Sequence, residues 1–85
     1  MHASIYTKSN CKFCSMLKKF LDQAGVTYDE TNLDSPEMLA LFKEQKPSVK
    51  KVPHVVVEGR DINSNDYHAM LIQLLELKKQ ETQNV

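Results

Sequence analysis

Cys11-Lys12-Phe13-Cys14 is the stretch around which the rest of this sequence is organised. The chain has 2 cysteines, and both lie here, between a short apolar run (Ala3 to Tyr6) and a helical pattern that ends at Gly25. A helix N-terminus favours an anion, and the thiolate is the reactive form of cysteine. We therefore predict that Cys11 attacks a disulfide and that Cys14 resolves the mixed disulfide that forms.

Length and charge limit the possible classes of protein. The 85 residues predict a single domain over 1–85, with residues 79–85 as a frayed tail. Apolar residues make up 41% of the chain and charged residues 26%, as is typical of a globular protein. The 11 basic and 11 acidic residues balance, so we expect no nucleic-acid and no membrane partner. We also expect a monomer.

We expect no targeting signal in this sequence. Met1-His2-Ala3-Ser4 does not open a signal peptide, and no apolar run approaches the about 18 residues of a membrane span. We therefore expect a cytoplasmic protein, in which a cysteine pair is more often catalytic or metal-binding than structural. His54, expected to point out of its strand, and His68 lack zinc-ligand spacing with the cysteines, so no metal is expected.

Hydrophobic periodicity predicts the order β-α-β-α-β-β-α. The first two strands must run parallel, joined by a right-handed crossover helix, and the last two form a hairpin that turns at Gly59-Arg60. Helices should cover both faces of a small mixed sheet. The expected strands are 1–6, 26–33, 54–58 and 61–63, and the expected helices are 12–24, 36–46 with Ser35 as its cap, and roughly 65–78.

This order, with Cys-x-x-Cys at the first strand-to-helix junction, resembles the thioredoxin-like fold, and the chain is similar to glutaredoxins in particular. Tyr6 to Cys14 resembles the family's Tyr-[Ser/Thr]-Lys-x-x-Cys-Pro-Tyr-Cys. Val52-Pro53 resembles its Thr-Val-Pro block, and Asn63-Ser64-Asn65-Asp66 its Gly-Gly-x-Asp. The resemblance spans residue 3 to about 78. It implies an α/β fold with a four-stranded mixed sheet, helices on both faces and a cis peptide bond before Pro53.

The resemblance also implies a thiol–disulfide oxidoreductase with glutathione as co-substrate and no tightly bound cofactor. Lys8 and Asp66 are then candidates for the charged ends of glutathione, although each is also explained as a surface charge, and Asp66 as an acid at a helix N-terminus. The backbone of Val52 would pair with an extended substrate. The full set of expected substrate-binding residues is Lys8, Lys12, Phe13, Lys51, Val52, Pro53, Ser64, Asn65 and Asp66.

Four of these residues have an open alternative. Lys12 and Lys8 should favour the thiolate, but an exposed lysine has little effect on a neighbouring sulfur. Phe13 either offers a ring face to the substrate or packs in the core. The loop lysines Lys46, Lys50 and Lys51 flank the same site and either attract an acidic substrate or are simply solvated.

Several departures from the family pattern keep other functions open. Lys12 replaces a proline, Phe13 a tyrosine and Lys51 a threonine, and side chains at Asn63-Ser64 would crowd a contact that glycines permit. One alternative is a glutaredoxin-like thioredoxin that is reduced by thioredoxin reductase and donates electrons to ribonucleotide reductase. Another is an iron–sulfur carrier. The expected partners are disulfide-containing proteins, with glutathione reductase and NADPH acting through glutathione, or thioredoxin reductase.

Overall fold

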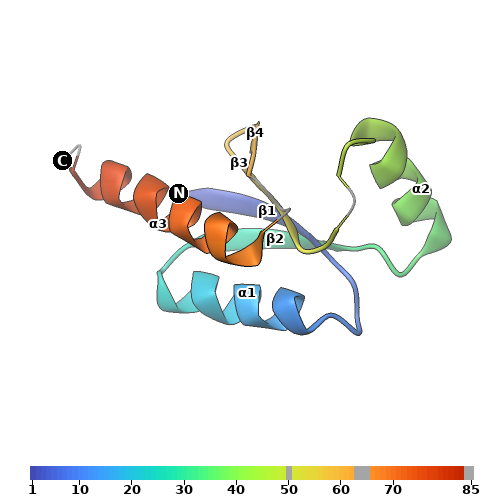
Figure 1. Cartoon of the computed structure of the whole chain (residues 1–85), viewed down its shortest axis with the longest axis horizontal. Helices are drawn as coiled ribbons and strands as arrows, with labels where there is room; N and C mark the ends of the chain where they lie inside the picture. Colours follow the sequence, from blue (N-terminus) through green and yellow to red (C-terminus); the bar gives the residue numbers. More distant parts are fainter. Residues whose placement is uncertain (50, 63–65, 84–85) are drawn as a thin grey trace.

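The computed structural model describes residues 1–49, 51–62 and 66–83, and Figure 1 shows the whole chain. Strands and helices follow one another in the predicted order. No helix among the described residues has both the length and the apolar character needed to cross a membrane. The elements are β1 (His2–Thr7), α1 (Lys12–Gln23), β2 (Thr27–Asn32), α2 (Pro36–Gln45), β3 (His54–Val57), β4 (Arg60–Asp61) and α3 (Tyr67–Gln83).

The strands form a four-stranded mixed sheet in the order β2-β1-β3-β4. β1 and β2 are parallel, with His2 opposite Thr27 and Thr7 opposite Asn32, and α1 makes the crossover between them. β3 is antiparallel to both β1 and β4. The predicted parallel pair, hairpin and mixed sheet are therefore confirmed.

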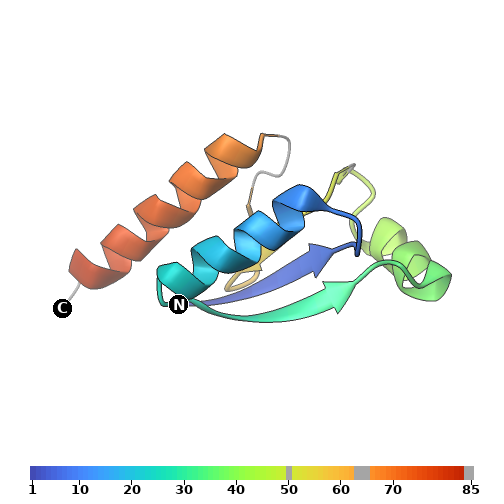
Figure 2. The same ribbon diagram turned by 90° about the horizontal axis from the view of Figure 1, so that it is seen from below.

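α1 and α3 cover one face of the sheet (Figure 2). Alternation along the two central strands directs Ala3 and Ile5 of β1, and their cross-strand partners Val57 and Val55, to this face. They form a core cluster with side chains from both helices. Its buried members are Ala3, Ile5, Leu17, Leu21, Val26, Val55, Val57, Ile62, Met70 and Leu74.

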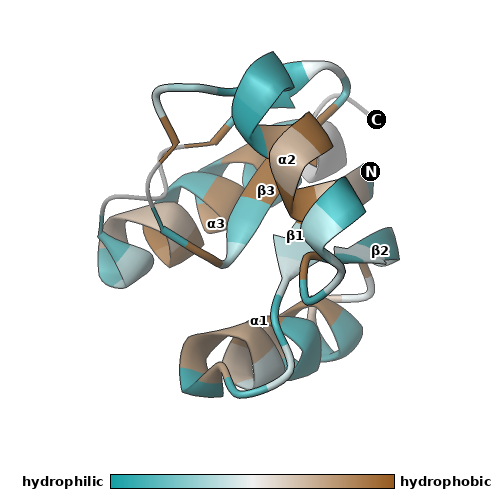
Figure 3. Ribbon diagram, turned by 90° about the vertical axis from the view of Figure 1, so that its right-hand side faces the viewer, coloured by the Kyte–Doolittle hydropathy of each residue, from teal (hydrophilic) through white to brown (hydrophobic). Residues whose placement is uncertain are grey.

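α2 lies on the opposite side of the strands from α1 (Figure 3). Its buried residue is Phe42, whose ring lies 4.8 Å from that of Tyr6 and 5.9 Å from that of His54. His54 is only 1% exposed, so the prediction that it points out of the strand was wrong. It faces away from the main core, but β3 is an interior strand and α2 covers this face as well.

Both ends of α1 are set by local sequence. Cys11 is its N-cap, in extended conformation, and Gly25 follows the helix with a φ of 71°. The N–H of Val26 donates to the carbonyl of Leu21 (2.9 Å) and that of Gly25 to Asp22 (3.2 Å), which is the Schellman arrangement. The predicted helix stop at Gly25 is therefore confirmed.

Three local predictions need correction. The hairpin turn is Glu58-Gly59, one residue earlier than expected, with φ values of 52° and 77° and Val57 opposite Arg60. Ser35 occupies the N-cap of α2, but its side chain makes no capping hydrogen bond. α3 continues past the predicted end to Gln83 because Lys, Gln and Glu are good helix formers and no Gly or Pro interrupts them.

Candidate active site

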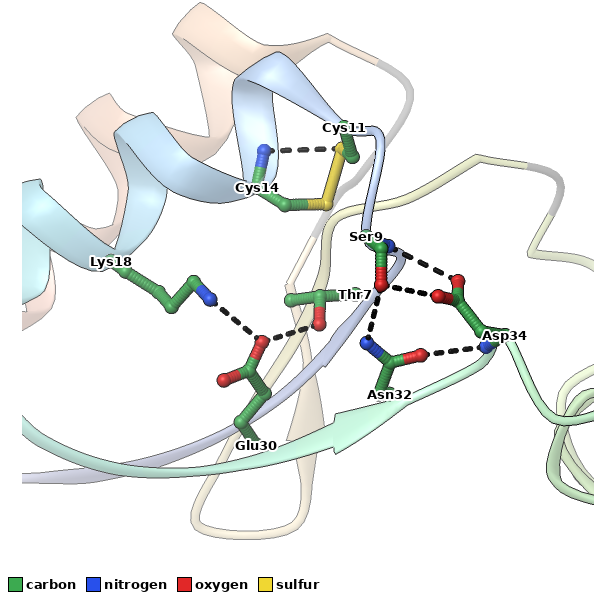
Figure 4. A network of polar contacts seen from close by, with 8 residues as sticks. All are labelled: Thr7, Ser9, Cys11, Cys14, Lys18, Glu30, Asn32 and Asp34. Atoms are coloured by element: carbon green, nitrogen blue, oxygen red, sulfur yellow. Dashed lines mark hydrogen bonds and ion pairs between the residues drawn. A yellow bond between two sulfur atoms is a disulfide. The ribbon is translucent and has the colours of Figure 1, made fainter.

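Cys11 and Cys14 are joined by a disulfide at the first turn of α1 (Figure 4). The Cys14 N–H donates to Cys11 Sγ at 3.1 Å, so the Cys11 sulfur takes the place of a helix-capping acceptor. Cys11 is partly exposed, whereas Cys14 is 1% exposed. One sulfur can therefore be reached from solvent while the other is shielded by the fold.

The loop that leads into Cys11 is tied to the segment between β2 and α2 (Figure 4). Asp34 accepts hydrogen bonds from the N–H of Ser9 (3.1 Å) and from its hydroxyl, and these two bonds hold the pKa of Asp34 below its ordinary value. Asn32 donates to the Ser9 hydroxyl oxygen at 3.3 Å and accepts from the Asp34 N–H at 2.7 Å. These contacts fix the approach to the N-terminus of α1.

A second polar cluster joins β1, β2 and α1 (Figure 4). The hydroxyl of Thr7, which is 1% exposed, donates to Glu30 Oε2 at 2.5 Å, and Lys18 Nζ lies 2.9 Å from the same oxygen. The hydrogen bonds from Thr7 and then Lys18 hold the pKa of Glu30 below its ordinary value. Lys18 follows Cys14 by four residues and so lies on the same side of the helix.

A basic cleft of about 210 Å³ opens between α2, the loop that leads from β1 to α1 and the segment before β3, and neither cysteine is among its lining residues. Lys8, Lys43 and Lys51 line it, so an anionic ligand would meet several ammonium groups. Val52, which precedes Pro53 through a cis peptide bond, forms part of the wall. The other lining residues are Leu33, Leu39, Phe42 and Val49.

Two predicted residues lie within or beside the cysteine turn. Phe13 is 47% exposed, which rules out the purely core role, and its ring lies 4.8 Å from that of Tyr67 on α3. Burial raises the pKa of Tyr67. Lys12 is exposed at the first position of α1. Phe13 thus presents an apolar surface next to the partly exposed sulfur.

The remaining predicted residues have mixed outcomes. Asp66 Oδ1 accepts from the N–H groups of His68 (2.9 Å) and Ala69 (3.4 Å), so it caps α3. Lys46 forms an ion pair with Asp61 at 2.8 Å and is not among the residues that line the cleft. Ser64 and Asn65, and Lys50 of the loop, lie outside the described residues.

Among the described residues, no group of three or more His, Cys, Asp and Glu side chains is arranged to hold a metal ion.

The sequence of the chain matches one protein-family model over residues 3–62, and that model describes glutaredoxin. The chain belongs to the glutaredoxin family. It is a glutaredoxin-like protein with the thioredoxin fold and a cysteine pair of the dithiol type. The match includes both cysteines, the three cleft lysines and the Val52–Pro53 bond, but it ends before Asp66.

Individual relatives include both glutaredoxins and a glutaredoxin-like protein. Glutaredoxin-C6 of Oryza sativa subsp. japonica is 32% identical over 66 residues, which cover 73% of this chain and 58% of that protein. The glutaredoxin-like protein NrdH of Lactococcus lactis subsp. lactis is 40% identical over 37 residues, 42% of this chain and 51% of that protein. The matched stretches span between 37% and 61% of the lengths of the curated relatives.

Among solved structures, glutaredoxin 1 from Francisella tularensis, in complex with cacodylate, superposes with a TM-score of 0.74. The superposition covers 89% of this chain and 94% of that one at 17% sequence identity, and it supports the fold alone.

Sequence reasoning missed several residues that the structure brings to the site. Lys43 lines the cleft, but nothing in the pattern of α2 indicated that this lysine shares a cleft with Lys8 and Lys51. Asp34 and Ser9 are far apart in the sequence and meet only because β1 and β2 end side by side. Tyr67 is the first residue of α3, and only the packing of α1 beside α3 places its ring against Phe13.

Proposed function

We propose that this protein is a dithiol–disulfide oxidoreductase that reduces mixed disulfides between glutathione and proteins, and protein disulfides as well. The observation that carries the proposal is the cysteine pair at the N-terminus of α1, with Cys11 partly exposed and Cys14 buried. In the reduced protein, the Cys14 N–H and the helix N-terminus would favour the thiolate of Cys11 at neutral pH.

The reaction proceeds by two exchanges. The Cys11 thiolate attacks the glutathione sulfur of a mixed disulfide, and the protein sulfur leaves as a thiolate that takes up a proton. Cys14 loses its proton and attacks the Cys11 sulfur, which releases glutathione and forms the Cys11–Cys14 disulfide. Two further molecules of glutathione reduce that disulfide and leave as glutathione disulfide. Two electrons thus pass from glutathione to the substrate.

The cleft supports glutathione as the co-substrate. Glutathione carries two carboxylates, and Lys8, Lys43 and Lys51 line one cleft, with Lys8 in the loop that leads to Cys11. Ammonium groups bind carboxylates as point charges, and in a half-exposed cleft each such contact contributes modestly to the binding free energy. Asp34, which interacts electrostatically with Lys8, lowers the positive potential at one end of the cleft. The carboxylates of glutathione would therefore bind nearer to Lys43 and Lys51.

A second candidate differs only in the source of electrons. A thioredoxin reductase would reduce the Cys11–Cys14 disulfide directly, and ribonucleotide reductase would be the electron acceptor. The match to NrdH, 40% identical over 37 residues, favours this candidate. Lys12, at the position where glutaredoxins usually have a proline, also supports it.

A coupled assay separates the two candidates. NADPH oxidation is followed with a glutathionylated peptide as substrate, first with glutathione and glutathione reductase and then with thioredoxin reductase alone. We expect turnover in the first arrangement. Turnover in the second arrangement alone would show that thioredoxin reductase, and not glutathione, is the electron donor.

Cysteine variants test the role of each sulfur. Cys11→Ser should abolish turnover in both arrangements, whereas Cys14→Ser should accumulate a glutathione adduct on Cys11, detected as a mass increase of the intact protein. Lys19→Ala, at an exposed position on the same helix, serves as the control and should leave turnover unchanged. Full activity in Cys11→Ser would refute the assignment of the nucleophile.

A further inference from the structure

One carboxylate oxygen at the edge of the sheet holds two residues from different elements. Asp61 Oδ1, on β4, lies 2.8 Å from Lys46 Nζ and 2.9 Å from His54 Nε2. Lys46 is the C-cap of α2, and His54 is the first residue of β3. We call Asp61, Lys46 and His54 the Asp61 clamp.

The Asp61 clamp holds both ends of the segment that forms one wall of the basic cleft. Between Lys46 and His54 lie Val49, Lys51 and Val52, all of which line the cleft. The Lys46 carbonyl also accepts the Val49 N–H at 3.1 Å, which joins the start of this segment to the clamp. A displacement at Asp61 would therefore act on both ends of the wall.

His54 is an unusual choice if packing is its only role. Its side chain is 2% exposed, and Nδ1 has no hydrogen-bond partner among the described residues. A donor at Nε2 leaves Nδ1 as a bare acceptor, and a buried acceptor without a partner is unfavourable. An apolar residue would fill the space beside the Tyr6–Phe42 ring pair at lower cost. The contact with Asp61 is what such a residue would lose.

α2 has few other attachments to the sheet. Phe42 is its buried residue, and its N-cap Ser35 makes no side-chain capping bond. Asp61 itself is half exposed, with 55% of its side chain accessible, and the hydrogen bonds from Lys46 and then His54 hold its pKa below the ordinary value. The carboxylate is thus ionised at neutral pH and attracts both partners.

We propose that Asp61 is a positioning residue for the cleft: through Lys46 and His54 it sets where the end of α2 and the wall residues Val49, Lys51 and Val52 lie relative to the dithiol. This inference rests on the proposed function, because the cleft is where glutathione would bind. Asp61 does not line the cleft, so it would act on substrate binding only through the clamp.

The other edge of the sheet supplies a matched control. Asp29 on β2 also pairs with a histidine, His2, at 3.0 Å, and 63% of its side chain is exposed. Neither residue is among those that line the cleft. Asp29→Ala and Asp61→Ala therefore remove the same kind of contact, and only the second removes the clamp.

The experiment compares the steady-state kinetics of both variants with a glutathionylated peptide. For Asp61→Ala we expect KM to rise about threefold to fivefold, as the loss of a half-exposed ion pair allows, with kcat little changed. Asp61→Asn keeps an oxygen acceptor, so its KM should lie between that of Asp61→Ala and that of the unmodified protein. Asp29→Ala should have the same KM and kcat as the unmodified protein. Amide hydrogen exchange of residues 51–57 should accelerate in Asp61→Ala and not in Asp29→Ala.

The results that would overturn the inference are distinct from those that would overturn the proposed function. The positioning role is refuted if Asp61→Ala has the same KM and exchange rates as Asp29→Ala. It is also refuted if Asp61→Ala lowers kcat and kcat/KM together and leaves KM unchanged. If Asp61→Ala does not fold, Lys46→Met is judged by the same criteria, since it removes the ion pair and keeps the aliphatic stem. Absence of turnover in the unmodified protein refutes the proposed function instead, and the exchange measurement still tests the clamp.

Discussion

Glu30→Gln should destabilise the protein at neutral pH and have no effect in acid. Glu30 Oε2 accepts from Thr7 at 2.5 Å and from Lys18 at 2.9 Å, and 31% of its side chain is exposed. A hydrogen bond to a charged group contributes about 1.5–3 kcal/mol when buried, and an exposed ion pair about 0–1 kcal/mol. Glutamine keeps an oxygen for Thr7 and loses the charge, so we expect a loss of about 1 kcal/mol.

The sign of the pH dependence follows from the direction of the pKa shift. The pKa of Glu30 is lowered in the folded protein, first by the Thr7 hydrogen bond and then by that of Lys18. The stabilisation is therefore complete above the pKa of unfolded glutamate, about 4.3, and is lost as the pH falls through the folded value. At pH values below the folded pKa of Glu30, the two proteins should approach equal stability.

Urea denaturation of the two reduced proteins at pH 7 and in acid measures this difference directly. At pH 7, a loss of about 1 kcal/mol corresponds to a fall in Tm of roughly 4–8 °C for a domain of this size. Glu76→Gln, at an exposed position on α3, is the control for loss of a carboxylate. A Glu30→Gln deficit that is equal at both pH values would refute an ionic origin.

Three further outcomes are expected. Lys43→Ala should raise KM for a glutathionylated peptide by about threefold at low ionic strength and less in high salt, because screening weakens the exposed charge; Lys19→Ala should not. Positions 58 and 59 both have positive φ, which asparagine and glycine tolerate better than other residues. In urea denaturation, Glu58→Asn should therefore stabilise the protein by about 0.5 kcal/mol, and Gly59→Ala should destabilise it by about 1 kcal/mol. Ultraviolet titration of the reduced protein should show one thiol ionising below the value of about 8.5 of free cysteine, absent in Cys11→Ser, and two ordinary thiols would contradict the proposed thiolate.

Local patterns were sufficient for the order of the elements and for the position of the dithiol. Apolar spacing and the glycine stop delimited α1, and the β-branched run after Pro53 marked β3. The cis bond before Pro53 came only from the family resemblance, since most bonds of this type are trans. Turn boundaries were less accurate, because Glu58 adopts a positive φ that its side chain does not favour.

The environment of His54 shows what local patterns cannot provide. His54 was expected to point out of its strand, but the strand order and the placement of α2 decided that this side of β3 is covered rather than exposed to water. The same holds for Lys43, whose place in the cleft depends on how α2 rests on the sheet. The burial of His54 and the place of Lys43 in the cleft both depend on which distant segments pack together in the fold.

The sequence by itself determined the chemistry, because two cysteines at a strand-to-helix junction are set by residues that are adjacent in the chain. Only the tertiary structure decided which sulfur is buried, which lysines share a cleft and which carboxylate joins Lys46 to His54. These contacts join segments that are distant in the sequence, and their partners depend on sheet order and helix packing rather than on any local periodicity.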